Sequence, residues 1–356
     1  MQTAHELLQK LADFDAQEAL VLSIYLDMRP HATGENPAQR TSDIVLKDRL
    51  REIEKTLLPR GPALEEFRRD AERVQHYIEE HAEPWLEGLA IFACDRHGLF
   101  EVLEAGVHFD DEVMLEPHPD LFQLAHLIDE QETAVMALVD TNTARLFVTR
   151  RGFLEEVAGP DDDPFGYGKR NTGALNHKRY HRRAENKRKA FAREAAAAIE
   201  ELVQHEGASR VLLAGDAVAI PLLHQSLSSQ IEPLVHEEIL RLDIRTPRHE
   251  VKEEIRPLLD QIEAEESHEV ADRLIEAIQA QGLGLSGLQE TKDALEHGQV
   301  EVLVLANDAP IDEEARRELV RLATNTGARV ETVQGHGALQ RLGGVGALLR
   351  YRMSWV

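Results

Sequence analysis

Residues 287–306 read GLQETKDALEHGQVEVLVLA, and the order of elements in this stretch is the basis of the fold prediction. Its first half predicts a helix over 287–296, and the unbroken apolar run that follows predicts a buried strand over 300–306. The same order, a helix followed by a strand, returns over residues 312–333. The segment from residue 249 to residue 356 is therefore predicted to fold as an α/β/α sandwich.

The helix expected before this stretch contains Pro257, which predicts a late start or a kink, and Gly282-Leu283-Gly284 is expected to end it. The glycine-rich stretch near the end of the chain, residues 342–351, reads LGGVGALLRY. Its glycines predict close backbone packing beside an apolar strand.

Two further segments lie before this one. Residues 1–130 begin with a helical pattern, and two strands joined by a turn, 88–94 and 99–103, lie in their second half, which predicts an α/β or α+β domain. Residues 131–248 alternate strands with helices, which predicts a mixed, partly parallel sheet with a long helix over about 176–204. Three domains are thus expected in all.

Composition limits the class of protein. The chain has 356 residues, of which 42% are hydrophobic and 29% charged, which is ordinary for a folded globular protein. Its one cysteine, Cys94, lies in an apolar run and is expected to be buried, so neither an internal disulfide nor a cysteine zinc site is predicted. No basic leader and no apolar stretch of about 20 residues is present, which predicts a cytoplasmic protein that does not contact membranes.

A basic run stands out in a chain whose formal net charge is −25. Residues 169–193 read KRNTGALNHKRYHRRAENKRKAFAR and hold ten Lys or Arg against one acid, Glu185. The first part predicts an exposed glycine-containing loop, and the second part predicts a helix that is basic on several faces. Such a helix binds RNA in a salt-dependent way, because each contact with a phosphate releases counterions. Tyr167 and Tyr180 are candidates for stacking on bases.

The predicted RNA-binding residues all belong to this run. They are Lys169, Arg170, Asn171, Thr172, Gly173, His177, Lys178, Arg179, His181, Arg182, Arg183, Lys187 and Arg188. The alternative interpretation is a solvated helix whose charges pair with the many acids of the chain, and the charge density favours RNA over it. His177 and His181, four residues apart, suit one helix face, but no nearby acid or cysteine completes a metal site, so no metal and no cofactor are predicted.

Motifs of nucleotide and ester hydrolysis are absent from the sequence. Neither a Walker A loop nor a GxSxG elbow occurs, so the chain itself is not predicted to be a GTPase or ATPase. Gly215-Asp216 follows a short strand and is interpreted as a strand-to-helix turn rather than a ligand-binding turn.

Three stretches resemble one family. Residues 342–351 resemble the terminal motif of archaeal and eukaryotic class-1 release factors and Pelota. Residues 287–304 resemble the same proteins, in which a helix ending in Ala-Leu-Glu leads into a buried strand. The strand 21–27 ends in Tyr-Leu-Asp and resembles the opening of bacterial members of the superfamily, which include the Balon hibernation factors and the bacterial release-factor-like families.

The resemblance implies a ribosomal role for the middle segment. In the release factors, this domain carries a Gly-Gly-Gln loop and a basic helix, and the loop helps water attack the ester of peptidyl-tRNA. The matching place here is 166–176, where Asn171-Thr172-Gly173-Ala174 replaces the motif, and no glutamine occurs from Glu132 to Val203. The Asn-Ile-Lys-Ser stop-codon motif is absent too, and no catalytic residue is assigned.

Three functions remain open at this point. The preferred one is a non-hydrolytic factor that binds the ribosomal RNA of the A site and the peptidyl-transferase centre, for hibernation or rescue, with an elongation-factor GTPase as an open second partner. The alternative is a peptidyl-tRNA hydrolase in which Asn171, Asn176 or His177 orients water. The third is an RNA-binding adaptor with no ribosomal role.

Overall fold

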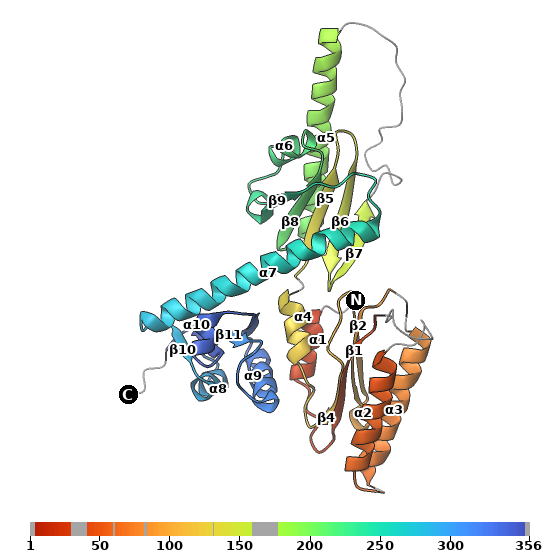
Figure 1. Cartoon of the computed structure of the whole chain (residues 1–356), viewed down its shortest axis with the longest axis vertical. Coiled ribbons are helices and arrows are strands. Elements are labelled where there is room, and N and C mark those ends of the chain that lie inside the picture. The colour runs from red at the N-terminus through yellow and green to blue at the C-terminus, as the bar shows by residue number, and fades with distance from the viewer. Residues whose placement is uncertain are drawn as a thin grey trace. The chain divides into compact units, whose positions relative to one another are not determined.

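The structure is a computed structural model, and its elements are drawn in Figure 1. It describes residues 4–29, 41–59, 61–81, 83, 85–130, 132–158 and 177–352, with the backbone alone for Thr41, Ala158 and 177–185. Contacts divide the chain into two compact units, which are residues 1–130 with 260–356, and residues 131–259. The division into three domains with boundaries at 130 and 248 stays a prediction.

The N-terminal part of the first unit is a four-stranded antiparallel sheet with helices on both faces. Its elements are α1 (Ala4–Ala12), β1 (Val21–Asp27), α2 (Thr41–Thr56), α3 (Pro62–His81), β2 (Gly88–Cys94), the 3₁₀ turn η1 (Asp95–His97), β3 (Leu99–Ala105), β4 (Glu112–Glu116) and α4 (Phe122–Glu130). The strand order is β3-β2-β1-β4. The central strands β1 and β2 are buried along their length, because a sheet covered on both faces excludes water from every side chain. Cys94 is buried, as predicted.

The C-terminal part of the first unit confirms the predicted α/β arrangement. Its elements are the later part of α7 (Arg248–Gln279), then β10 (Gly284–Ser286), α8 (Leu288–Glu296), β11 (Val300–Ala306), α9 (Glu313–Asn325), β12 (Arg329–Val333), α10 (Gly337–Arg341) and β13 (Val345–Leu349). The strand order is β10-β13-β11-β12, with β11 and β12 parallel. The order helix, strand, helix, strand that was predicted over residues 287–333 is therefore confirmed as α8, β11, α9 and β12.

The glycines of the LGGVGALLRY stretch allow close packing, as the sequence predicted. A Cβ built on Gly346 would lie 2.7 Å from the carbonyl oxygen of Leu285 and 2.8 Å from the side chain of Leu274 on α7. Gly344 has a φ of +72°, and a Cβ there would lie 2.7 Å from that of Ala309. Both positions therefore exclude larger residues, because real Cβ atoms do not approach so closely.

The second unit is a mixed five-stranded sheet, which confirms the predicted partly parallel arrangement. Its elements are β5 (Ala134–Val139), β6 (Ala144–Arg150), β7 (Phe153–Ala158), α5 (His177–Glu206), β8 (Arg210–Gly215), α6 (Ala219–His224), the 3₁₀ turn η2 (Glu232–Leu234), β9 (Val235–Leu240) and the start of α7. The order is β7-β6-β5-β8-β9, and β8 is parallel to both β5 and β9. Helices α5 and α6 share one apolar core with one face of this sheet.

Arg145 on β6 fixes the segment that leads into α7. It is buried, forms two hydrogen bonds with Glu156 at 2.7 and 2.8 Å, and donates to the carbonyl oxygens of Ile244 and Thr246. Its guanidinium also lies 5.0 Å from the centre of the Phe147 ring. A buried guanidinium is tolerated only when its N–H donors have partners. Here Glu156 on β7 and the two carbonyl oxygens before α7 supply them.

Of the two expectations from Pro257, a late start of α7 is wrong, and a kink stays a prediction. The helix begins at Arg248 and includes Pro257. Val251, Ile255 and Leu258 are buried at helical spacing on this first part of α7, which belongs to the second unit. A proline inside a helix costs about 3 kcal/mol, and burying three large apolar side chains gains about 1.5–3 kcal/mol each, so burial decides where the helix begins.

Carboxyl groups gather where α4 meets β12 within the first unit. One oxygen each of Asp129, Glu263 and Glu331 lies within 4.8 Å of the others. Asp129 Oδ2 accepts hydrogen bonds from the N–H of Thr332 at 2.9 Å and from its hydroxyl at 3.4 Å. Burial, with the charge of Glu331 as the next cause, raises the pKa of Asp129 well above its usual range. Burial also raises the pKa of Glu130 to about 7.

We expect Gly215→Ala to destabilise the second unit by about 2–4 kcal/mol. Gly215 ends β8 with a φ of +125°, and a Cβ there would overlap the carbonyl oxygen of Val139 on β5. The matched control is Gly207→Ala, because Gly207 has a φ of +63° with nothing within 4 Å, so it should cost only about 1 kcal/mol. Hydrogen exchange of the β5 and β8 amides measures both, and equal losses would contradict the steric argument.

We expect the first unit to lose stability between about pH 5 and pH 8. A carboxyl group with a raised pKa binds its proton more tightly in the folded state, so its contribution declines as pH rises from about 4 toward the folded value. Asp129→Asn should remove much of this slope and raise stability at pH 8 by about 1–3 kcal/mol, with less change at pH 5.

Urea unfolding at both pH values, followed by hydrogen exchange in α4 and β12, measures this effect. The control is Glu18→Gln, because Glu18 is exposed and lies outside the cluster formed by Asp129, Glu263 and Glu331. A pH slope that Asp129→Asn leaves unchanged would show that the raised pKa is not coupled to folding.

Candidate nucleic-acid interface

Helix α5 is anchored by its second half. Phe191, Ala195, Ile199 and Val203 recur every four residues and are all buried in the core of the second unit. This spacing places them on one face of the helix, which packs on the sheet. The helix predicted over about 176–204 is confirmed, with bounds of His177 and Glu206.

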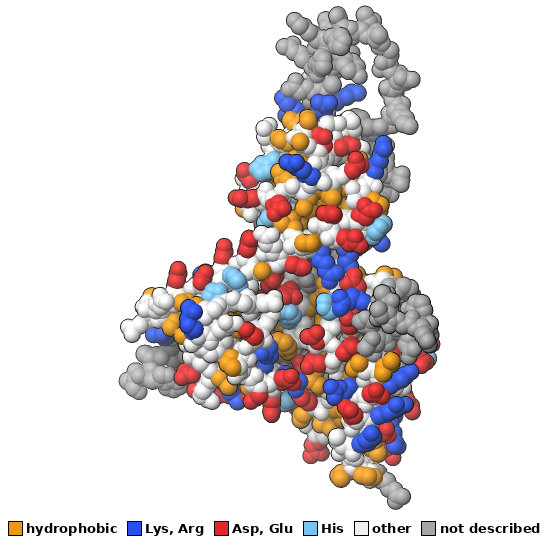
Figure 2. Space-filling view, viewed as in Figure 1, with side chains coloured by type: hydrophobic (Ala, Val, Ile, Leu, Met, Phe, Trp, Pro, Cys, Tyr) orange, Lys and Arg blue, Asp and Glu red, His pale blue; other side chains and the backbone are white. Residues whose placement is uncertain are grey.

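Residues 186–189, the part of α5 before this stripe whose side chains the structure describes, do not belong to such an apolar face. The side chains of Asn186, Lys187, Arg188 and Lys189 are all exposed, although four consecutive residues cover more than one full turn of a helix. Figure 1 shows this end of α5 extending beyond the end of the sheet. Figure 2 shows Lys and Arg side chains gathered at the same end of the second unit. The helix therefore presents a basic surface that the core of the unit does not cover.

The structure places part of the predicted binding set on this helix. The residues on the α5 backbone whose side chains are not described are His177, Lys178, Arg179, His181, Arg182 and Arg183. Lys187 and Arg188 are exposed on the same helix. Lys169, Arg170, Asn171, Thr172 and Gly173 lie outside the described residues, as do Tyr167 and Asn176.

The charge pattern of α5 opposes the helix dipole. Its first turn has no acidic residue, and Lys178 and Arg179 lie close to the positive end of the helix. Cations near a helix N-terminus and like charges three or four residues apart destabilise a helix, by about 0.2–0.5 kcal/mol for each like-charge pair. The same arrangement adds to the positive potential that attracts phosphate groups. A pattern that costs stability without helping the fold indicates a binding role.

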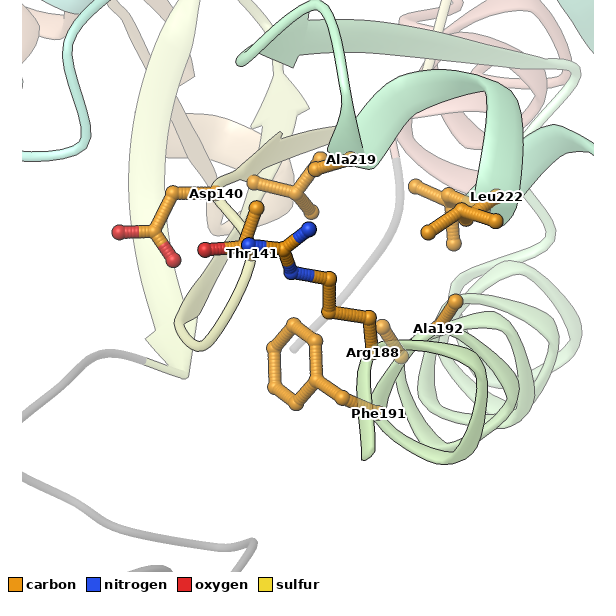
Figure 3. Close-up of a pocket in the computed structure, with 10 residues that line it drawn as sticks. Asp140, Thr141, Arg188, Phe191, Ala192, Ala219 and Leu222 are labelled. Carbon is orange, nitrogen blue, oxygen red and sulfur yellow. The ribbon is translucent and has the colours of Figure 1, made fainter. Parts of the chain in front are cut away.

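The structure also brings together groups that the sequence did not connect. Arg188 lines a depression with Thr141 from the turn after β5 and Ala219 from α6 (Figure 3). The group formed by Asp129, Glu263 and Glu331 was missed as well. Neither has a local signal, because each combines single residues from segments that are far apart along the chain.

In the part of the chain that the structure covers, no helix combines the length and the apolar character that crossing a bilayer requires.

Comparisons with known proteins agree with the motifs. The model of the "Bacterial archaeo-eukaryotic release factor family 2" matches residues 133–280, and that of "eRF1 domain 3" matches residues 264–353. The Pelota homologue of Pyrococcus furiosus is 29% identical over 194 residues, which are 50% of this chain and 53% of that protein. The homologue of Thermococcus gammatolerans is 25% identical over 250 residues, covering 67% of each.

The chain thus spans about half to two thirds of the length of these curated relatives. A solved structure described as a model of ribosome-bound archaeal Pelota and ABCE1 is 17% identical, with a TM-score of 0.47 over 99% of this chain and 95% of that chain.

The two family models overlap within α7 and together extend from residue 133 to residue 353. Curated Pelota proteins of the same superfamily also match this chain. The chain therefore belongs to the superfamily of archaeal and eukaryotic class-1 release factors and Pelota.

Proposed function

We propose that this protein binds the ribosome as a Pelota-like factor that occupies the vacant A site, for rescue or hibernation, and does not release peptide. The observation that carries the proposal is the basic first half of α5. It is a surface of Lys and Arg in a chain of net charge −25, on the domain that matches the bacterial release-factor family. Phosphates of ribosomal RNA are the partners that this surface suits.

The rest of the chain supports a specific RNA site rather than general affinity for nucleic acid. Acidic residues outnumber Lys and Arg by 65 to 40, so most of the surface repels phosphates. Several basic side chains elsewhere are already paired with acids. On α2 and α3, Arg49, Arg51 and Arg68 form ion pairs with nearby acidic residues. Cations already neutralised by neighbours release few counterions on binding RNA, which leaves α5 as the favoured contact.

The absence of peptide release follows from side-chain chemistry. Ester hydrolysis in the peptidyl-transferase centre needs a positioned water and stabilisation of the developing oxyanion. At the place of the release-factor glutamine, this chain offers Asn171, Thr172 and Gly173. Asparagine is one methylene shorter than glutamine, and a misplacement of about 1 Å costs about 100-fold in rate. The proposed role is therefore binding, in the cytoplasm, with an elongation-factor GTPase as a candidate delivery partner.

Charge reversal on α5 tests the binding surface. Replacing Lys178, Arg179, Arg182 and Arg183 with Glu should weaken cosedimentation with empty ribosomes by at least about 100-fold, because repulsion replaces counterion release. The slope of log affinity against log salt should become shallower by about three, at about 0.7–0.9 for each lost phosphate contact.

The matched control for this experiment changes the net charge by the same amount elsewhere. It replaces Arg49, Arg51, Arg68 and Arg69 with Glu, all of which are more than half exposed and paired with acids in the first unit. This variant should keep most of the affinity. Equal losses in the two variants would assign binding to net charge alone, and unchanged binding of the α5 variant would overturn the proposal.

Peptide release from stalled ribosomes tests the chemistry. The unmodified protein should bind these complexes and release peptide no faster than buffer. The triple variant Asn171→Gly, Thr172→Gly, Gly173→Gln should raise release above background, because it restores the glutamine that the related release factors use.

The hydrolase alternative predicts the opposite result. In that case, the unmodified protein releases peptide well above buffer, and Asn171→Ala with His177→Ala removes the activity. Binding to free RNA without cosedimentation with ribosomes would instead support an adaptor with no ribosomal role.

A further inference from the structure

A shallow depression lies beside the basic surface, at the end of β5. It is a shallow dip in the surface that is open to solvent and bounded by three elements of the second unit. Helix α5 contributes Arg188, Phe191, Ala192 and Ala195, the end of β5 and its turn contribute Val139, Asp140 and Thr141, and α6 contributes Ala219, Leu222 and Leu223. The depression therefore opens at the carboxyl ends of parallel strands β5 and β8, which is where open α/β sheets bind ligands.

Arg188 is the cation of this depression. Figure 3 shows its side chain reaching from α5 toward Thr141, with the Phe191 ring on the same side of the depression. Among the described residues, Arg188 is exposed and takes part in no hydrogen bond or ion pair. A guanidinium that folding leaves without a partner keeps its five donors and its flat face available to a ligand.

The lining decides which ligand class fits. Seven of the ten lining residues are Val, Phe, Ala or Leu, and all but Leu222 are buried, so the exposed part of the lining is mainly the Arg188 side chain beside a small apolar surface. A flat group on the guanidinium suits this site better than a bare phosphate. The carboxylate of Asp140 already accepts hydrogen bonds from the N–H groups of Asn142 and Thr143 at 2.7 and 2.6 Å, so it supports the turn. A planar group that stacks on a guanidinium and covers apolar side chains has the chemistry of a nucleobase.

We propose that Arg188 and this depression hold one unpaired base of the RNA whose phosphates lie along α5. The inference rests on the proposed ribosome binding and adds to it a contact that depends on a base. Lys187 precedes Arg188 on the helix, Arg193 follows it about one and a half turns later, and both are exposed. These two exposed cations on other faces of the helix suit phosphates of the same RNA, while Arg188 takes the base.

The variant Arg188→Lys separates stacking from charge. Lysine keeps the positive charge and loses the planar guanidinium, so ribosome affinity should fall about 10-fold at every salt concentration with the same salt slope. Lys187→Gln is the neighbouring control, because loss of a phosphate contact should reduce the slope by about 0.7–0.9. Both side chains are exposed, and circular dichroism checks that both variants fold.

A defined RNA supplies the second measurement. A single-stranded adenosine decamer should bind the full-length protein more tightly than a decamer with abasic sites, and Arg188→Lys should abolish that difference. Unchanged ribosome affinity of Arg188→Lys, or an equal loss on both decamers, would overturn the base contact while leaving ribosome binding intact. Failure of the unmodified protein to bind ribosomes would instead overturn the proposed function itself.

Discussion

The apolar stripe on the second half of α5 is the constraint on which the basic surface of this helix depends. Phe191, Ala195, Ile199 and Val203 are buried in the core of the second unit and hold the helix on its sheet. Because an α-helix is stiff over several turns, anchoring one half determines where the other half points. Lys187 and Arg188, which precede Phe191, are exposed and lie outside this packed face. The same helix thus supplies both the core and the surface.

The sheet beneath α5 is held from its other side by a polar contact. Arg145 joins β6 to Glu156 of β7 and to the carbonyl oxygens before α7, and α7 then buries Val251 and Ile255. Strands β5 and β8 are apolar and buried along nearly their whole length, as expected for strands shielded from water on both faces. The burial on α7 explains why the helix tolerates Pro257, since the apolar burial on either side of it exceeds the cost of one missing hydrogen bond.

Binding and catalysis make different demands on the second unit. Attraction to RNA needs charge at suitable density, and it tolerates small shifts of single side chains because phosphates are closely spaced. Hydrolysis needs one group placed within a fraction of an ångström. A chain that keeps ten cations between residues 169 and 193, and has no glutamine from Glu132 to Val203, meets the first demand and lacks the residue type that the related release factors use for the second.

The sequence by itself determined the elements and the location of the charge. Strands 134–139 and 300–306, helix α5 and the basic run were predictable, because hydrophobic period and composition are local properties. Only the tertiary structure decided that Asp129, Glu263 and Glu331 meet, and that Thr141 and Ala219 border Arg188. A late start of α7, one of the two expectations from Pro257, is wrong for the same reason. Pro257 is a local signal, whereas the burial of Val251, Ile255 and Leu258 that outweighs it depends on the tertiary packing of the unit.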